Sequence, residues 1–203
     1  MKIFFDIGAN NGSSSLHLLK EHDWTVYAFE PTPELISHIK SQVGNNKRYN
    51  IIPMAVGNEN KIIKFNIAGH YDWGCSSDLN FSDNLDKTWE GREDFYFTSQ
   101  IDVQMIKLID FCKANDVTKI DYLHIDAQGF DYEVLLGLED MINIVEEGCL
   151  ETAQNHDVKL YKDQKYVLDD VLRFLITHNF TITKIIENDR FHNELNVYFK
   201  KRN

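Results

Sequence analysis

The sequence predicts an α/β fold in which helices cover both faces of a mostly parallel sheet. Short apolar runs alternate along the chain with segments of helical periodicity, the pattern of consecutive βαβ units. The first of these runs is nearly continuous in apolar residues, as expected for a strand buried on both faces. The last two runs follow each other with no helix between them, which predicts an antiparallel hairpin at the edge of the sheet.

The first half of the chain has the clearest alternation of strand and helix. The run at 2–7 stops at Gly8, which predicts a buried strand that ends in a turn. The segment 13–21 places three leucines on one helical face. Thr32 and Pro33 are typical of an N-cap and of the first helical position. The expected elements are a strand at 2–7, a helix at 13–21, a strand at 25–29, a helix from Thr32 through Val43, and strands at 49–56 and 61–67.

The second half begins with a long irregular segment and then returns to alternation. Residues 68–97 show no periodicity, and a loop of that length inside one domain is usually functional. The segment 166–178 is strongly amphipathic and predicts a helix. The expected elements after the loop are a strand at about 96–103, a helix through Met105, Ile106, Ile109 and Cys112, a strand at 120–125, a helix at 130–138, a strand at 144–150, a helix at 166–178, and hairpin strands at 181–186 and 195–200.

Size and charge narrow the class of protein. With 203 residues, 43% of them hydrophobic and 26% charged, the chain has the composition of one globular domain, which we take to span 1–203. A net charge of −11 argues against nucleic acid and against anionic membranes as partners. No apolar run is long enough for a transmembrane helix and the N-terminus does not resemble a signal peptide, so we expect a cytoplasmic protein.

The three cysteines do not suggest a disulfide framework or a metal site. Cys75, Cys112 and Cys149 are widely spaced and odd in number. Cys112 and Cys149 have apolar neighbours and are expected to pack as small hydrophobic residues, whereas Cys75 lies in a polar loop where it could be exposed.

The turn after the first strand has the features of a ligand site. Gly8 lies where the strand would lead into a helix, and a glycine there lets a ligand approach the backbone. Glu30 ends the second strand, 22 residues after Gly8, or about one βαβ unit. In an open α/β sheet ligands bind at the carboxyl ends of the strands, and a carboxylate there can accept hydrogen bonds from both hydroxyls of a ribose.

The same turn favours one nucleotide over others. A dinucleotide motif needs a central glycine that is replaced here by Asn10, and no phosphate-binding GK[ST] sequence follows a glycine-rich turn. Asp6 would repel a phosphate, but it could bind the ammonium group of a methionine moiety, directly or through water. S-adenosylmethionine therefore fits this turn better than NAD or ATP does.

Several motifs together resemble the FkbM-family methyltransferases over nearly the whole chain. Residues 121–131, DYLHIDAQGFD, are similar to the family's KIDVQGxE, and residues 6–12 match its DxGANxG. Residues 28–31 read AFEP, residues 54–57 resemble xAVG, and Ser76-Ser77 provide a further match. Two positions depart from the pattern, since the family's lysine is His124 here and its glutamate is the shorter Asp131.

The resemblance implies a class I methyltransferase, which is a Rossmann-like three-layer sandwich. Its sheet has seven strands, mostly parallel, and the expected C-terminal hairpin supplies the antiparallel strand. The cofactor would be S-adenosylmethionine, leaving S-adenosylhomocysteine as product. The cofactor residues implied by matching positions are Asp6, Gly8, Asn10 and Gly12 at the methionine end, Glu30 and Pro31 at the ribose, Met54 and Ala55 beside the adenine, and Asp126 near the transferable methyl.

Transfer to an alcohol requires removal of a proton, so we expect a general base beside the methyl group. Asp126 is the first choice because it ends a strand that faces the cofactor, and Glu151 and His156 are the competing candidates. Asp126, Asp131 and Glu151 could also converge on a divalent metal, but no compact ligand cluster is evident and we do not favour metal dependence.

The irregular segment 68–97 is the expected acceptor-binding loop. It combines aromatic residues with carboxylates, a mixture that suits the C–H faces and hydroxyls of a sugar. The expected acceptor residues are Tyr71, Trp73, Ser76, Trp89 and Gln128. We therefore expect O-methylation of a sugar of a glycan or glycoconjugate. One alternative is the same enzyme acting on a polyketide-like acceptor, and another is an inactive nucleoside-binding module. A nicotinamide dehydrogenase is a third, more distant alternative.

Overall fold

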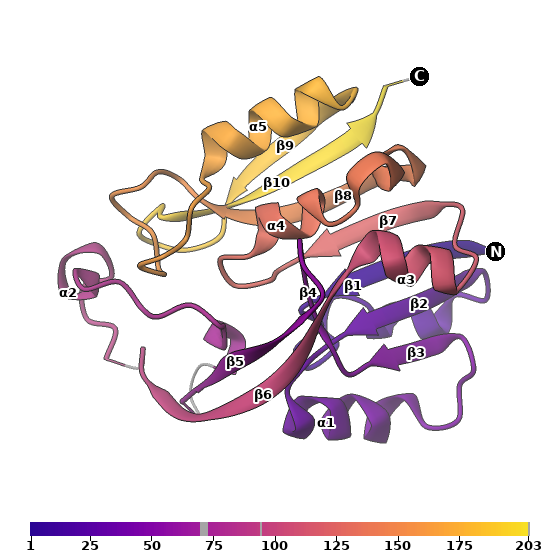
Figure 1. The fold of residues 1–203 in the computed structure, drawn as a ribbon, viewed down its shortest axis with the longest axis horizontal. Coiled ribbons are helices and arrows are strands. Elements are labelled where there is room, and N and C mark those ends of the chain that lie inside the picture. The colour runs from indigo at the N-terminus through magenta and orange to yellow at the C-terminus, as the bar shows by residue number, and fades with distance from the viewer. Residues whose placement is uncertain (70–72, 94, 203) are drawn as a thin grey trace.

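The computed structural model describes residues 1–69, 73–93 and 95–202, and for Trp73 it describes the backbone alone. A seven-stranded sheet runs through the centre (Figure 1). Its strands are β1 (Lys2–Ile7), β2 (Trp24–Phe29), β3 (Tyr49–Ile52), β7 (Ile120–Ile125), β8 (Val145–Ala153), β9 (Phe180–Glu187) and β10 (Glu194–Lys201).

The strand order is β3-β2-β1-β7-β8-β10-β9. β1 pairs in parallel with both β2 and β7, and β7 pairs in parallel with β8. β10 runs antiparallel to β8 and to β9, so the predicted seven-stranded sheet with an antiparallel terminal hairpin is confirmed. The order reverses at β1, which places the carboxyl ends of β1, β2 and β7 together at the ligand-binding edge of the sheet.

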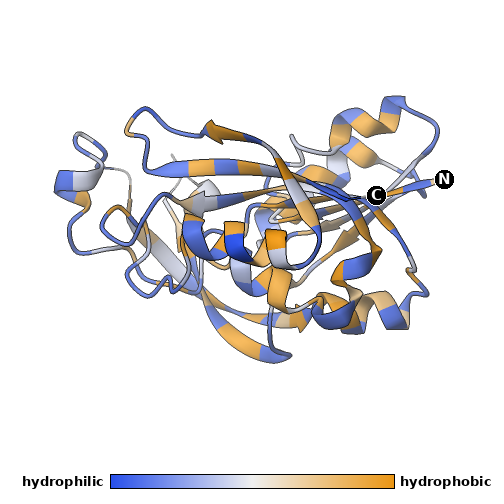
Figure 2. Cartoon of the chain, turned by 90° about the horizontal axis from the view of Figure 1, so that it is seen from above, coloured by the Kyte–Doolittle hydropathy of each residue, from blue (hydrophilic) through white to orange (hydrophobic). Residues whose placement is uncertain are grey.

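Helices cover both faces of this sheet. One face carries η1 (Leu16–Lys20) and α1 (Pro33–Val43), and the other carries α3 (Leu108–Ala114), α4 (Asp131–Leu136), η3 (Glu139–Ile144) and α5 (Leu168–Thr177). Figure 2 shows hydrophobic and hydrophilic residues alternating along these helices, as an apolar face turned to the core requires. The helix expected at 13–21 is only the short 3-10 helix η1, because the turn that begins at Gly12 occupies its first residues.

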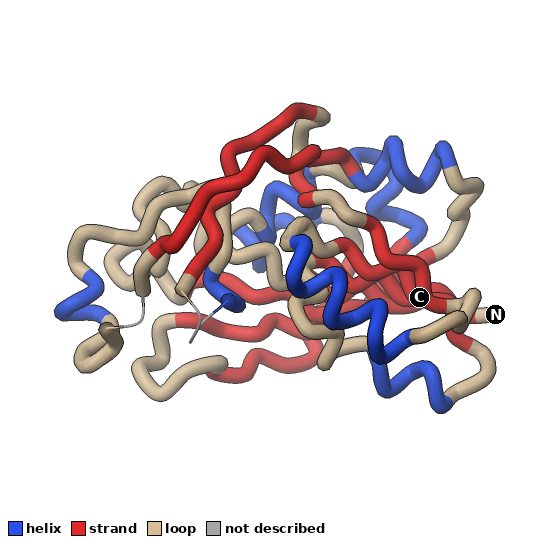
Figure 3. The backbone as a smooth tube through the Cα atoms, turned by 90° about the horizontal axis from the view of Figure 1, so that it is seen from below, coloured by secondary structure: helices blue, strands red, loops and turns tan. Residues whose placement is uncertain are grey.

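A second, three-stranded sheet lies apart from the main one (Figure 3). Its strands are β4 (Ala55–Gly57), β5 (Lys61–Ala68) and β6 (Phe97–Lys107), in the order β4-β6-β5. The single strand expected at 49–56 is therefore wrong, since the chain leaves the main sheet between β3 and β4. The expected helix through Met105 and Ile106 is also wrong: both belong to β6, where Val103 and Met105 point inward in a strand's alternation.

The irregular segment folds back on the protein as a cluster of its own. It contains η2 (Trp73–Cys75) and α2 (Leu85–Thr88), and isolated bridges join Asn66 to Ser77 and Phe81 to Tyr161. Cys75 and Trp89 are buried in this cluster with Leu160 and Tyr161. Cys75 is therefore buried rather than exposed, because the polar loop closes over it.

Within the described ranges, none of the helices has the length and apolar character needed to cross a membrane.

Candidate functional site

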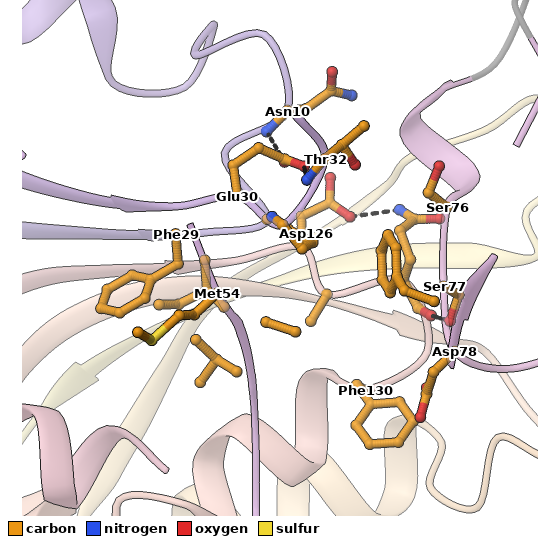
Figure 4. A pocket seen from close by; sticks show the side chains of 18 of the residues that line it. Asn10, Phe29, Glu30, Thr32, Met54, Ser76, Ser77, Asp78, Asp126 and Phe130 are labelled. Atoms are coloured by element: carbon orange, nitrogen blue, oxygen red, sulfur yellow. Dashed lines mark hydrogen bonds between the residues drawn. The ribbon is translucent and has the colours of Figure 1, made fainter. Parts of the chain in front are cut away.

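Two cavities meet at the carboxyl ends of the central strands. The first encloses about 640 Å³ and the second about 620 Å³ of open volume. Gly74, Asp126 and Gln128 line both cavities and thus lie at their boundary. Figure 4 shows the first cavity with Glu30 and Asn10 at one end, Asp126 near the centre, and Ser76 to Asp78 across from them.

Gly8 brings the ends of β1 and β7 into direct contact. Its φ of +75° is unfavourable for other residues, and a Cβ at this position would lie 1.9 Å from the carbonyl oxygen of Asp126. The amide of Asp126 in turn donates to the carbonyl of Ile7 at 2.9 Å. The glycine predicted from the sequence therefore fixes the position of the strand-end aspartate, and it lines the first cavity itself.

Glu30 presents a buried carboxylate to the first cavity. It is 4% exposed, and its two oxygens accept the backbone N–H of Asn10 at 2.8 Å and of Thr32 at 2.7 Å (Figure 4). Burial raises the pKa of Glu30 to about 7, although these N–H groups act in the opposite direction. A carboxylate has about four acceptor positions, so about two remain for hydroxyl groups of a ligand.

The floor of the first cavity is largely apolar. Pro31, Met54 and Ala55, which the sequence suggests as cofactor residues, line it together with Phe29 and Phe130. Apolar walls with a few placed polar groups are typical of sites for small molecules and cofactors. Among the described residues, the arrangement thus fits an adenosine whose ribose reaches Glu30.

Asp6 and Gly12 lie behind the cavity rather than on its described wall. Asp6 is fully buried, accepts a hydrogen bond from the Ser15 hydroxyl, and is paired with His124 Nδ1 at 2.9 Å. Burial opposes protonation of His124, but the hydrogen bond and charge of Asp6 outweigh it and raise the pKa of the imidazole. Gly12 has a φ of +81° and allows the turn to close against Leu16. These residues support the loop that carries Gly8 and Asn10.

The second cavity is rich in carboxylates and amides. Gln128 Nε2 lies 2.5 Å from Asp126 Oδ1 and 3.2 Å from Glu151 Oε2, and the side-chain amide of Asn188 donates to the other oxygen of Glu151. Burial, together with the charges of Glu194, Asp126 and Asp131, raises the pKa of Glu151 well above its ordinary value. Burial also raises the pKa of Asp126, against the opposing effects of the Gln128 amide and of His124.

The structure brings together some of the predicted catalytic and acceptor residues and separates others. Asp126, Glu151, Gln128 and Trp89 all line the second cavity, and Ser76 lines the first. His156 lies on an exposed turn and lines neither cavity. Tyr71 lies outside the described residues, as does the side chain of Trp73.

Asp131, considered above as a metal ligand, is engaged with the backbone. Its carboxylate accepts the N–H of Ala127 at 2.9 Å and of Gly129 at 3.2 Å, and so holds the turn after β7. Within the described parts of the chain, no group of three or more histidine, cysteine, aspartate or glutamate side chains is arranged to hold a metal ion.

Sequence reasoning missed several residues of the second cavity. Asn188 and Glu194 come from the link and second strand of the terminal hairpin, and Leu160 comes from the loop after β8. The only available signal was the polar character of the link between the hairpin strands, which does not distinguish a cavity wall from a solvated turn.

The strand order, the glycine turn after β1 and the carboxylate after β2 together define a class I methyltransferase. The structure is similar to that of Aeropyrum pernix fibrillarin in complex with natively bound S-adenosyl-L-methionine, with a TM-score of 0.54 and 10% identity over 98% of this chain and 65% of that one. It is also similar to an rRNA methylase from Streptococcus thermophilus, with a TM-score of 0.50 and 13% identity over 100% of this chain and 87% of that one.

The chain belongs to the family described as Methyltransferase FkbM domain, which it matches over residues 6–199. A relative is the 2-O-methyltransferase NoeI of Sinorhizobium fredii (strain NBRC 101917 / NGR234), 24% identical over 140 residues. That match covers 66% of this chain and 56% of the relative, so the chain spans little more than half the length of that protein. S-adenosylmethionine is the cofactor that goes with this family and fold, as the sequence predicts.

Proposed function

We propose that the chain transfers a methyl group from S-adenosylmethionine to a hydroxyl of a small acceptor, and that this acceptor is a sugar of a glycan or glycoconjugate. The observation that carries the proposal is the meeting of two cavities at Asp126 and Gln128. One cavity suits the cofactor and the other is polar, so the transferable methyl would lie at their boundary.

The cofactor would occupy the first cavity in a defined direction. Glu30 would hold the ribose hydroxyls, the apolar floor around Met54 would hold the adenine, and Gly8 and Asn10 would face the methionine end. The sulfonium activates the methyl group when the cofactor is bound. The protein then has to align the acceptor oxygen with the methyl carbon and to exclude water.

Asp126 is placed to take the acceptor's proton. As the acceptor oxygen bonds to the methyl carbon, the carbon–sulfur bond breaks and its electron pair remains on sulfur. The proton of the hydroxyl passes to the carboxylate of Asp126, so the products are a methyl ether, S-adenosylhomocysteine and a protonated aspartate. The location of Asp126 on the wall of both cavities supports this role over that of His156.

The second cavity supports an oxygen-rich acceptor. Trp89 lines it at 2% exposure. The side chains of Gln128, Glu151 and Asn188 also line it, and their polar atoms can exchange hydrogen bonds with the hydroxyls of such an acceptor. The aromatic surface of Trp89 and the amide of Asn188 complete a lining of the kind that binds sugars. The relative NoeI is named as a 2-O-methyltransferase, which supports oxygen as the nucleophile.

The test is methyl transfer from isotopically labelled S-adenosylmethionine to a panel of acceptors. The panel contains deoxyhexosides, the corresponding amino sugars and hydroxylated polyketide fragments, and Asp126→Asn is the control variant. Label in a sugar methyl ether, lost in Asp126→Asn, is the expected result. Transfer of the label to the polyketide fragments alone would show that the acceptor is a polyketide rather than a sugar. Tight binding of S-adenosylhomocysteine with no product from any acceptor would support the inactive nucleoside-binding module instead.

A further inference from the structure

Tyr161 lies behind the boundary between the two cavities, on the loop that follows β8. It is 1% exposed, and its ring stacks on Phe81 with 5.6 Å between ring centroids. Its hydroxyl lies 2.7 Å from Gln128 Oε1 and 2.9 Å from the carbonyl oxygen of Cys75. None of the sequence motifs includes this residue.

The backbone of Gln128 is held as firmly as its side chain. Gln128 has a φ of +49°, and the Ser77 hydroxyl donates to its carbonyl at 2.8 Å. The next residue, Gly129, has a φ of +91°, and a Cβ there would lie 2.9 Å from the ring of Tyr161. Glycine at this position therefore lets the tyrosine lie directly against the turn that presents Gln128.

The hydrogen-bond capacity of the groups favours one orientation of the Gln128 amide. The amide has one acceptor oxygen and two N–H donors. With its oxygen toward the Tyr161 hydroxyl, the NH₂ group has one hydrogen for Asp126 and one for Glu151, at 2.5 and 3.2 Å. The reverse orientation would place the amide oxygen against two carboxyl groups and leave them without these donors. The Tyr161 hydroxyl has a single hydrogen, and the nearer of its two acceptors is Gln128 Oε1, at 2.7 Å against 2.9 Å for the carbonyl oxygen of Cys75. Donation to Gln128 stabilises the orientation that supplies both hydrogen bonds.

Other carboxyl groups surround Asp126 and Glu151. Glu151 faces Asp126 and Asp131 from the turn after β7 and Glu194 from β10, and the Asn188 amide also contacts it. Asp126 also interacts with His124. Among the interactions described for Asp126, His124 contributes the one positive charge, and that charge lowers the pKa of Asp126. Burial and the neighbouring carboxyl groups therefore raise the pKa of both Asp126 and Glu151, and the two groups titrate as a pair.

We propose that Tyr161 is a positioning residue: by holding the Gln128 amide in one orientation, it keeps an N–H donor directed at Asp126 and another at Glu151. The claim about the amide and the carboxyl groups stands on the geometry, whereas its catalytic consequence rests on the proposed function. Tyr161 does not contact either carboxyl group in the hydrogen bonds described, so it acts on them through Gln128.

The test compares Tyr161→Phe with Tyr166→Phe as a matched control. Tyr166 stacks on Tyr132 with ring centroids 4.0 Å apart and lines neither cavity. The carboxyl carbons of 13C-labelled Asp and Glu are titrated by NMR, with Asp126→Asn and Glu151→Gln assigning the two signals. In Tyr161→Phe the pKa of Asp126 should rise by about one unit, because the amide no longer donates reliably. Tyr166→Phe should titrate as the wild type does.

Gln128→Met provides a second test that does not depend on the tyrosine. It should shift the Asp126 titration as Tyr161→Phe does, and the double variant should show no larger shift than Gln128→Met alone. Superimposable titrations of Tyr161→Phe and wild type, or fully additive shifts in the double variant, would overturn the proposal. Binding of S-adenosylhomocysteine by calorimetry should stay within about threefold in Tyr161→Phe, because Tyr161 lines neither cavity, and this reports that the cofactor cavity is intact.

Turnover supplies the catalytic part of the test once an acceptor is in hand. Tyr161→Phe should lower kcat about tenfold at neutral pH with little change in KM, and should move the acidic limb of the pH profile upward by about one unit. An unchanged profile would refute the positioning role. A wild type that methylates nothing would refute the proposed function alone, because the NMR titrations still decide the orientation of the amide.

Discussion

We expect the buried carboxylate of Glu30 to make binding of the cofactor dependent on pH. In the free protein burial raises its pKa to about 7, with a smaller contribution from the charge of Asp6. Ribose hydroxyls donate hydrogen bonds, which favour the charged carboxylate. The ligand-bound protein therefore requires ionised Glu30. A protein molecule whose Glu30 is protonated in the free state must release that proton when the ligand binds.

The size of the effect follows from that pKa. Well above about pH 7 Glu30 is already ionised and the affinity is at its maximum, whereas below it the affinity falls about tenfold per pH unit, or about 1.4 kcal/mol. We therefore expect S-adenosylhomocysteine to bind about tenfold more weakly at about pH 6 than at about pH 8. Near the pKa, about half a proton should be released for each ligand bound.

The assay is titration calorimetry at several pH values, repeated in buffers of different ionisation enthalpy to count protons. Glu30→Gln is the control, because it cannot titrate. Its amide nitrogen would oppose the N–H of either Asn10 or Thr32, so its affinity should be at least about tenfold lower throughout. The variant should also lack most of the pH dependence. Affinity independent of pH in the wild type, with no proton release, would refute the assignment of Glu30 to the ribose.

Three further results are expected. Asp126→Asn should bind S-adenosylhomocysteine within about threefold of wild type but lose at least about a hundredfold in methyl transfer, and full turnover would require another base. Glu30, Asp131 and Glu133 each have a pKa raised by burial to about 7, so each contributes stability that is complete below its unfolded pKa and is lost as pH rises through about 7. The ligand-free melting temperature should therefore be higher at about pH 6 than at about pH 8, and the opposite order in a thermal scan would contradict these assignments. Gly8→Ala should destabilise the fold by several kcal/mol, at least about 3, since its Cβ would overlap the carbonyl of Asp126; a melting temperature within about 2 °C of wild type would count against that contact.

The cofactor end of the site was the part most open to prediction from the sequence. Gly8, Glu30 and Asp126 each end a strand, and parallel neighbouring strands bring their carboxyl ends to one edge of the sheet. A motif at the end of a strand therefore indicates where its residues lie in the fold as well as in the sequence. Asp6 belongs to the same motif, but its partner His124 lies 118 residues away, and that pairing has no local signal.

The second sheet and the acceptor side were less predictable because their partners are remote. Met105 and Ile106 have the spacing of a helical stripe with Ile109, and only pairing with β4 and β5 selects a strand. Trp89 lies in the irregular segment expected to bind the acceptor, and the structure buries it against Phe95 and Phe191. Tyr161 contacts Gln128 across 33 residues, and nothing around it in the sequence indicates a role.

Because Gly8 and Asp126 are in close contact, the geometry of one part of the site is fixed, whereas the rest of the site can vary. The cofactor turn and the strand-end aspartate are joined backbone to backbone, so neither can shift without the other. Trp89, Arg92 and Asn188, in contrast, line the second cavity without reaching the first. The proposed acceptor side can therefore change through these loops alone, while the spacing between the turn after β1 and the proposed base Asp126 stays fixed.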